Sequence, residues 1–320
     1  MMYQKRMIDH SRPHGSRFTI LQRDILRTLL YFDVFGHPLR LSEIYRYLPS
    51  NSVTTSDIQR AIDAAPLSEI LEKSSDFFYL KERTVDSVAQ RLSKELRAHT
   101  MFTAARFMSS IIRRFPFVRA IFVSGELSKG VASRNSDIDF FIVAAEHRVW
   151  ICRTLFTLFK KTVLLNSRKF FCYNHIASEH HLQIDDHNIY TATEIVTAFP
   201  IYNEHMFARF LAVNSWTASF LPNSVAALAR NDDEAPMRPL TERFLKLFLT
   251  DDQLDALDLW LMHRWQLIWK NRYATIPAEK RNELFRSNLF VSTAYAQDFL
   301  EKTLSRYRQR LISYGISTDP

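Results

Sequence analysis

The sequence has little cysteine, little glycine and no long apolar run. Its two cysteines, Cys152 and Cys172, are too few for a disulfide framework or a cysteine-rich zinc site. Five glycines against 25 phenylalanines favour well-packed helices over a turn-rich all-β protein. No stretch reaches the roughly 18 apolar residues that cross a bilayer, and residues 1–18 contain no apolar run typical of a signal peptide. We therefore expect a cytoplasmic protein with no membrane contact.

Apolar and charged residues occur in the proportions of a folded protein with a basic surface. Hydrophobic residues make up 47% and charged residues 24% of the 320 residues, enough for two or three domains with sizeable cores. The net charge is +8, and a positive surface favours the approach of a nucleotide or a nucleic acid. With 42 basic against 34 acidic residues, the excess is too small to assign a partner by itself.

The N-terminal part of the chain has the pattern of a winged helix. Residues 1–17 are polar and predict a flexible tail, and residues 18–84 show three short helical patterns followed by a hairpin at 70–80. A winged helix is a variant of the DNA-binding helix-turn-helix. The predicted third helix carries two aspartates beside one arginine, an unfavourable charge for the major groove. DNA binding and a packing role against protein both stay open.

The rest of the chain predicts a short mixed sheet flanked by helices, followed by a helical region, so the expected fold class is α+β. Within residues 85–200, a basic helix at 85–114 precedes strands at 120–124, 138–143 and 169–177, with a helix at 147–164 before the last strand. Residues 201–320 are mainly helical, with an exposed loop at 231–239 and a last helix at 292–314. In this region Trp260, Trp265 and Trp269 predict one packed helix stripe.

The segment from Ser124 to Val143 carries the residues best suited to chemistry. Side chains alternate along a strand, so Asp137 and Asp139 are expected on one side and Ile138 in the core. Two carboxylates about 7 Å apart along a strand repel each other unless a cation lies near them. Hard ions such as Mg²⁺ take oxygen ligands and keep positions open for phosphate. We therefore predict that Asp137 and Asp139 bind Mg²⁺ or Mn²⁺.

The turn before this strand is bounded by Gly125 and Gly130, which let backbone N–H groups approach an anion. Serine and lysine side chains in and beside the turn can add donors to a triphosphate. The predicted nucleotide-binding residues are Ser124, Gly125, Glu126, Ser128, Lys129, Gly130 and Ser136.

This combination resembles the DNA polymerase beta-like nucleotidyltransferase superfamily, whose pattern is a strand ending in Gly-Ser, a second glycine, and a strand with Asp-x-Asp. Gly125, Gly130, Asp137 and Asp139 match it, within roughly residues 118–177. The whole layout also resembles bacterial nucleotidyltransferase-domain proteins with an N-terminal winged-helix-like module and a helical C-terminal part. The resemblance implies that metal ions assist transfer of a nucleoside monophosphate from a nucleoside triphosphate to a hydroxyl of an unknown acceptor.

The sequence departs from the family pattern at two positions. Glu126 stands where the family has a serine that helps to hold phosphate. Asn174 stands on the next strand, where the family usually supplies a third carboxylate. Asparagine can ligate a metal through its carbonyl oxygen but cannot act as a general base. The alternatives for a third acid outside the strand are Asp185, Asp186 and Glu194, the last of which is also expected to form a helix capping box with Thr191.

Two hypotheses about function therefore stand side by side. In the first, the chain is an active nucleotidyltransferase with Asp137, Asp139 and Asn174 as its catalytic residues. In the second, the site is degenerate, and the chain is a nucleotide-sensing regulator that acts through its winged helix on DNA or on a protein partner. The departures at Glu126 and Asn174 favour the regulator, and the intact aspartate pair favours the enzyme.

Overall fold

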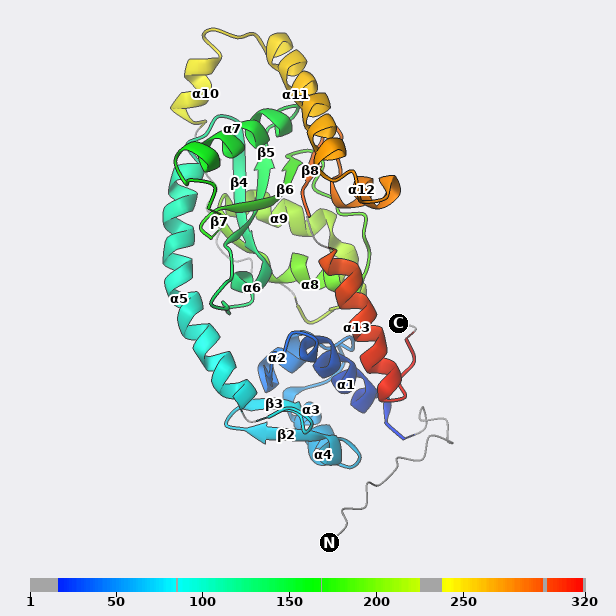
Figure 1. Cartoon of the computed structure of the whole chain (residues 1–320). Coiled ribbons are helices and arrows are strands. Elements are labelled where there is room, and N and C mark those ends of the chain that lie inside the picture. The colour runs from blue at the N-terminus through cyan, green and yellow to red at the C-terminus, as the bar shows by residue number, and fades with distance from the viewer. Residues whose placement is uncertain (1–16, 85, 168, 225–237, 296–297, 319–320) are drawn as a thin grey trace. The chain divides into compact units, whose positions relative to one another are not determined.

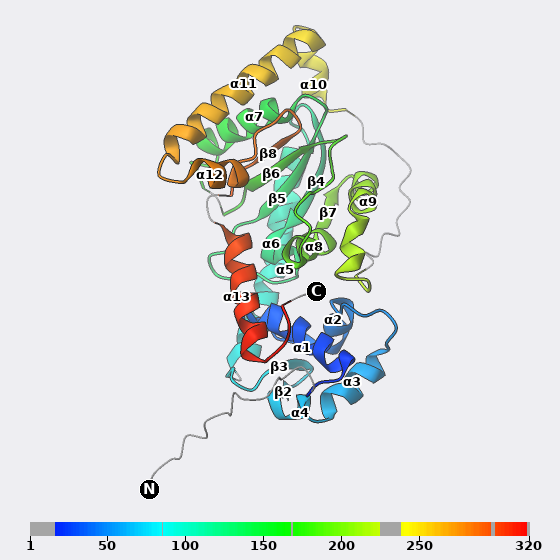
Figure 2. The same cartoon turned by 90° about the vertical axis from the view of Figure 1, so that its right-hand side faces the viewer.

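The computed structural model describes residues 17–84, 86–167, 169–224, 238–295 and 298–318. The fold is mixed α+β with two small sheets (Figures 1 and 2). The chain divides into two compact units, Met1–Ala89 with Leu221–Asn223 and Glu301–Pro320, and Gln90–Phe220 with Ser224–Leu300. Almost all of the predicted tail and most of the predicted loop at 231–239 lie outside the described residues. None of the described helices is long and apolar enough to cross a membrane.

The first unit contains short helices and an antiparallel sheet with the strand order β1-β3-β2. The predicted hairpin is confirmed, because Leu71 pairs with Leu80 and Ser74 with Phe77. Its elements are α1 (Ile20–Asp33), β1 (Leu39–Arg40), α2 (Leu41–Arg46), α3 (Thr55–Asp63), α4 (Leu67–Ile70), β2 (Leu71–Ser74) and β3 (Phe77–Leu80).

Nearly all of the C-terminal helix α13 (Phe299–Ser313) belongs to this first unit, although it lies more than 200 residues from β3 in the sequence. Arg310 at its end forms ion pairs with Asp33 of α1 and with Glu82, and the Tyr307 ring meets the Tyr31 ring edge-on at 5.4 Å. The helix predicted at 292–314 therefore begins later than expected. Residues Val291–Thr293 form a strand instead, because they complete the larger sheet.

The larger sheet lies in the second unit and has the strand order β7-β4-β5-β6-β8. β5 runs antiparallel to β4 and parallel to β6, with α7 as the connection between β5 and β6. The three predicted strands are confirmed to within a few residues, whereas the edge strands β7 and β8 were not predicted. The strands are β4 (Val118–Ser124), β5 (Asp139–Ala144), β6 (Cys172–Ser178), β7 (Phe199–Tyr202) and β8 (Val291–Thr293).

Helices cover both faces of this sheet (Figure 2). Along β4, Ile121 and Val123 pack on the side of α5, α7 and α11, while Ala120 and Phe122 pack on the side of α9. This alternation is what a strand buried on both faces requires. The helices of this unit are α5 (Asp86–Ile112, which begins in the first unit), α6 (Gly125–Ser128), α7 (Val149–Thr162), α8 (Ile189–Thr197), α9 (Glu204–Val213), α10 (Leu240–Leu245), α11 (Asp251–Arg272) and α12 (Ala278–Leu284).

The predicted tryptophan stripe is only partly correct. Trp265 and Trp269 pack against the core, but the Trp260 side chain is 57% exposed. Positions 265 and 269 are four residues apart and share one helix face, whereas position 260 points to the opposite side. Trp260 is therefore an outward-facing residue of α11.

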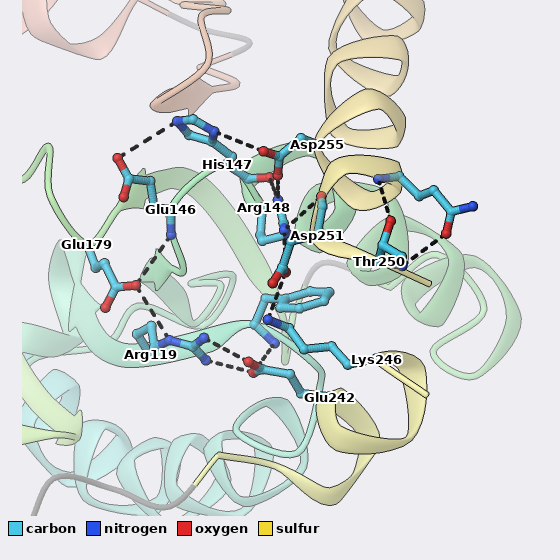
Figure 3. A network of polar contacts seen from close by, with 12 residues as sticks. Arg119, Glu146, His147, Arg148, Glu179, Glu242, Lys246, Thr250, Asp251 and Asp255 are labelled. Carbon is cyan, nitrogen blue, oxygen red and sulfur yellow. Dashed lines mark hydrogen bonds and ion pairs between the residues drawn. The ribbon is translucent and has the colours of Figure 1, made fainter. Parts of the chain in front are cut away.

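Ion pairs connect α10 to β4 and the start of α11 to the residue before α7 (Figure 3). Glu242 of α10, which is 1% exposed, accepts two hydrogen bonds from Arg119 of β4, at 2.8 and 2.9 Å, and one from the Phe117 N–H at 3.1 Å. Arg148, just before α7, pairs with Asp251 and Asp255 at the start of α11. These contacts join segments that lie more than 100 residues apart.

A buried carboxyl group caps the start of α7. Oδ1 of Asp258 accepts hydrogen bonds from the backbone N–H groups of Trp150 at 2.9 Å and Ile151 at 2.7 Å. Two of the free N–H groups at this helix N-terminus thereby gain an acceptor. Burial raises the pKa of Asp258 to about 7, although the two N–H donors act in the opposite direction.

We predict that Asp258→Asn and Asp258→Ala differ sharply in stability. A folded-state pKa of about 7, above an unfolded value near 4, means that stability falls as the pH rises from about 4 to 7. Asparagine resembles the protonated carboxyl, keeps an acceptor for both N–H groups and does not ionise. Asp258→Asn should therefore be more stable than wild type at pH 8, and the difference should shrink towards pH 4.

Asp258→Ala should lose about 1–3 kcal/mol of unfolding free energy, because two buried N–H groups lose their acceptor. Urea unfolding at pH 5 and pH 8 measures both effects. Equal destabilisation by both substitutions at both pH values would show that the pKa of Asp258 is not raised.

Candidate functional site

The sheet register brings the predicted site residues together at one edge of the larger sheet. β4 ends at Ser124, and β5 begins at Asp139, which lies directly opposite Ser124. Cys172, the first residue of β6, lies opposite Asp139 on the other side. The turn that starts at Gly125 therefore leaves the sheet beside the carboxylate of Asp139.

The two aspartates alternate with core residues as expected. Ile138 and Phe140 are buried, whereas Asp137 and Asp139 are partly exposed. Burial raises the pKa of Asp139 to about 7; the Cys172 hydrogen bond and Lys129 lower it, and the negative charges of Glu194 and Asp137 raise it further. A cation bound here would favour the ionised form of Asp139.

Gly125 lies so close to Asp139 that a side chain in its place would have to displace the Asp139 carboxylate. A Cβ atom at Gly125 would stand 2.6 Å from Oδ2 of Asp139, and the backbone has a φ of +69°, in the left-handed region. Gly130, at the end of the turn, has a similar φ of +72°, but a Cβ there would meet nothing within 4 Å. Gly125 is therefore needed for both its conformation and its small size, and Gly130 for its conformation alone.

Lys129 and the N–H of Gly125 both bind the side chain of Glu194. The Lys129 ammonium donates to Oε1 of Glu194 at 2.7 Å and to the Gly125 carbonyl at 3.0 Å. The Gly125 N–H donates to Oε2 of Glu194 at 3.2 Å, and the Ser128 hydroxyl donates to the Gly125 carbonyl at 2.9 Å. The Gly125 N–H and the Lys129 ammonium, two donors expected to hold phosphate, thus already bind a carboxylate of the chain itself.

Among the three candidate acids outside the strand, Glu194 is the one bound at this turn. It belongs to the second turn of α8, whose N-cap is Asn188, so the capping box predicted between Thr191 and Glu194 is wrong. Asp186 instead pairs with Arg286 at 2.6 Å. The sequence offered no signal that would separate Glu194 from the other two acids.

Glu126 turns towards the segment at 133–136. Its carboxylate accepts hydrogen bonds from the Ser133 N–H at 3.0 Å, the Ser133 hydroxyl at 3.2 Å and the Ser136 hydroxyl. Burial opposes ionisation, but these hydrogen bonds and the positive charge of Lys94 together hold the pKa of Glu126 below its usual value. Glu126 therefore braces the loop between the turn and β5 as an ionised group, and Ser136 is one of its partners.

Asn174 and Cys172 complete the surroundings of Asp139. Nδ2 of Asn174 donates to Oδ1 of Asp139 at 3.2 Å, so Asn174 lies beside the aspartate as predicted. The Cys172 thiol also hydrogen-bonds Asp139, and burial followed by the Asp139 charge raises the pKa of Cys172 to about 12. Sequence reasoning missed Cys172, because nothing in its spacing distinguishes it from an ordinary buried thiol.

The two carboxylates at this edge are oxygen donors of the kind that Mg²⁺ prefers, whereas Asn174 presents its amide Nδ2 to Asp139. Among the described residues, no group of three or more His, Cys, Asp or Glu side chains is placed to bind a metal ion. A metal here would therefore need ligands from the nucleotide phosphates or from water in addition to Asp137 and Asp139.

Comparison with known proteins gives no match: no family model, no curated protein and no solved structure matches the chain.

We predict that Gly125→Ala destabilises the protein more than Gly130→Ala. Both substitutions place alanine in a left-handed backbone, at a cost of about 1–2 kcal/mol, but only the methyl group added at position 125 would collide with Asp139. Urea unfolding measures the difference.

The double variant Gly125→Ala/Asp139→Ala serves as the control. Removal of the Asp139 carboxylate should recover most of the unfolding free energy that Gly125→Ala loses beyond the loss in Gly130→Ala. Equal losses for the two glycine variants would contradict the close approach of Gly125 to Asp139.

Proposed function

We propose that the chain is a metal-dependent nucleotidyltransferase that moves a nucleoside monophosphate from a nucleoside triphosphate to a hydroxyl group of an acceptor. The close approach of Gly125 to Asp139 is the observation that carries this proposal. It joins a carboxylate suited to Mg²⁺ with a turn whose N–H and lysine already hold an anion. A triphosphate with its bound metal needs both kinds of group side by side.

In this proposal Asp137 and Asp139 would hold the metal, and Asn174 would become a further ligand once its amide turned its carbonyl oxygen, instead of Nδ2, towards the metal. Bound Mg²⁺ would neutralise triphosphate charge and stabilise the pyrophosphate leaving group. Lys129 and the Gly125 N–H would hold phosphate oxygens. Since Glu194 uses these donors, a phosphate must displace its carboxylate.

The acceptor oxygen would form a bond to the α-phosphorus while the bond to pyrophosphate breaks, and the hydroxyl proton must pass to a base. Asn174 cannot take that proton. Glu194 is the acid bound at the turn, and we assign it this role once phosphate has displaced it from Gly125 and Lys129.

The first unit, with its three leading helices and hairpin, is proposed to be a winged helix. This supports the second candidate function, a nucleotide-sensing regulator that acts on DNA or a protein partner. The hydrogen bond from Asn174 to Asp139 favours that alternative, because an amide stands where a third carboxylate would complete the metal site.

The deciding measurement is pyrophosphate release from each of the four ribonucleoside triphosphates with Mg²⁺ or Mn²⁺. We expect release by wild type and its loss, by at least about 100-fold, in Asp137→Ala/Asp139→Ala, because the metal loses its protein ligands. Asp252→Ala, which changes an exposed aspartate of α11, is the matched control and should retain activity.

If wild type releases no pyrophosphate but gains thermal stability from nucleotide in a manner that depends on Asp137 and Asp139, the regulator is the correct function. If nucleotide neither reacts nor binds, both candidate functions are wrong.

Glu194 offers a separate prediction about affinity. Glu194→Gln removes a negative charge from the donors that phosphate would use, so ATP with Mg²⁺ should bind roughly 3- to 10-fold more tightly, equivalent to about 1 kcal/mol. Lys129→Ala should weaken binding, and Glu204→Gln, an exposed acid of α9, should leave it unchanged. Calorimetric titration measures all three. Weaker binding by Glu194→Gln would show that Glu194 supports the bound nucleotide instead of competing with it.

A further inference from the structure

A hollow of about 380 Å³ is lined by α11, by α12 and by the segment just after α12, all within the second unit. Its volume is in the range of small-molecule sites in proteins. None of its lining residues belongs to the glycine turn or to β5, and α12 lies apart from α6 in both views (Figures 1 and 2). The hollow is therefore separate from the candidate nucleotide site. Its lining residues are Gln266, Trp269, Lys270, Arg281, Asn282, Phe285 and Ser287.

Helix periodicity places polar groups around an apolar floor in this hollow. Gln266, Trp269 and Lys270 are three and four residues apart, so they share one face of α11. The Trp269 and Phe285 rings pack at 5.4 Å and are only 6% and 4% exposed. Nε2 of Gln266 donates to the Ser287 carbonyl at 2.9 Å and connects the two sides of the hollow. Because so little of either ring is exposed, a ligand would meet mainly the polar groups of the lining.

The described lining contains two cations and no acid. Neither Lys270 nor Arg281 forms an ion pair with another residue that the structure describes. Arg281 uses Nη1 for one hydrogen bond to a backbone carbonyl, at 3.2 Å. Glu283 and Asp298, which are acids near α12, both pair with Lys280. Two positive charges therefore meet at one hollow without an anion to balance them.

A third cation is buried against the floor of the hollow. Arg153 of α7 is 3% exposed and lies over the Trp269 ring at 5.2 Å. It donates to the Ser292 carbonyl at 2.9 Å, but its Nε has no hydrogen-bond partner, and no described carboxylate pairs with it. Burial lowers the pKa of Arg153 to about 10, so the side chain stays charged at neutral pH. A buried charge is screened less than an exposed one, so Arg153 adds to the attraction for an anion.

We propose that this hollow binds a phosphate monoester of a small polar molecule. A phosphate monoester carries nearly two negative charges at pH 7, which balance Lys270 and Arg281. Arginine binds two phosphate oxygens with its planar fork, and lysine adds a point charge. A single carboxylate would leave one of the two cations unbalanced. The side-chain amides of Gln266 and Asn282 can donate to and accept from the polar groups in the rest of the ligand.

The first test is calorimetric titration of the full-length Asp137→Ala/Asp139→Ala variant in EDTA. This variant lacks the proposed metal ligands, so the result does not depend on the proposed nucleotidyltransferase activity. Wild type in EDTA should give the same affinities, which guards against misfolding of the variant. The probes are AMP, glucose 6-phosphate, inorganic phosphate and adenosine.

At least one of the two esters should bind roughly 10-fold more tightly than inorganic phosphate and adenosine. Adenosine lacks the charge, and inorganic phosphate lacks the groups that would meet the amides. Tighter binding of AMP identifies the ligand as a nucleotide, and tighter binding of glucose 6-phosphate identifies it as a sugar phosphate. If neither ester binds, or if inorganic phosphate binds as tightly as both, the proposal is wrong.

Charge removal locates the bound ester. Lys270→Met and Arg281→Met keep the aliphatic stem of each side chain, and each should weaken binding roughly 10-fold. Arg264→Met, at an exposed arginine of α11 outside the lining, is the matched control and should bind as wild type does. Lys129→Met, at the glycine turn, should also leave the affinity unchanged.

Circular dichroism checks that each variant is folded. If Arg281→Met does not fold without its backbone hydrogen bond, Lys270→Met decides, because Lys270 is exposed. Binding that Lys270→Met retains in full, or that Lys129→Met abolishes, would place the ester elsewhere and overturn the proposal.

Discussion

The contact between Gly125 and Asp139 constrains everything around the candidate site. A carboxylate oxygen occupies the space where any other residue at position 125 would place its Cβ atom. This approach requires that β4 end opposite the start of β5, and that the chain leave the sheet in a left-handed conformation. The turn, its lysine and the first aspartate of the sheet are therefore positioned as one unit, and the loop braced by Glu126 follows from the same arrangement.

Carboxylates that accept backbone N–H groups recur through the second unit. Glu242 binds the N–H of Phe117, Asp258 those of Trp150 and Ile151, Glu126 that of Ser133, and Glu194 that of Gly125. The bonds of Glu242 and Asp258 satisfy buried donors that would be costly to leave unpaired. Three of the four acids provide a structural anchor without a competing ligand. Glu194 differs, because its donors belong to a turn that suits a phosphate, so the same bond that orders the turn also opposes the proposed ligand.

Helix α11 is held to the rest of the second unit by apolar packing and by ion pairs. Its inner residues complete the core on the α7 side of the sheet, and its first turn is held by Arg148 (Figure 3). Trp260, on the opposite side of the helix from Trp265 and Trp269, is 57% exposed.

The sequence by itself determined the local features: the hairpin of the first unit, the three inner strands of the larger sheet, and the alternation of Asp137 and Asp139 with core residues. These depend on periodicity and on turn-forming residues close together in the chain. Only the tertiary structure decided which acid reaches the glycine turn, which strands form the sheet edges, and which tryptophan of α11 faces outwards. An acid such as Glu194 carries no local pattern that names its partner 69 residues away. Such pairings depend on the register of the sheet and the packing of helices, which form only when distant segments are buried together.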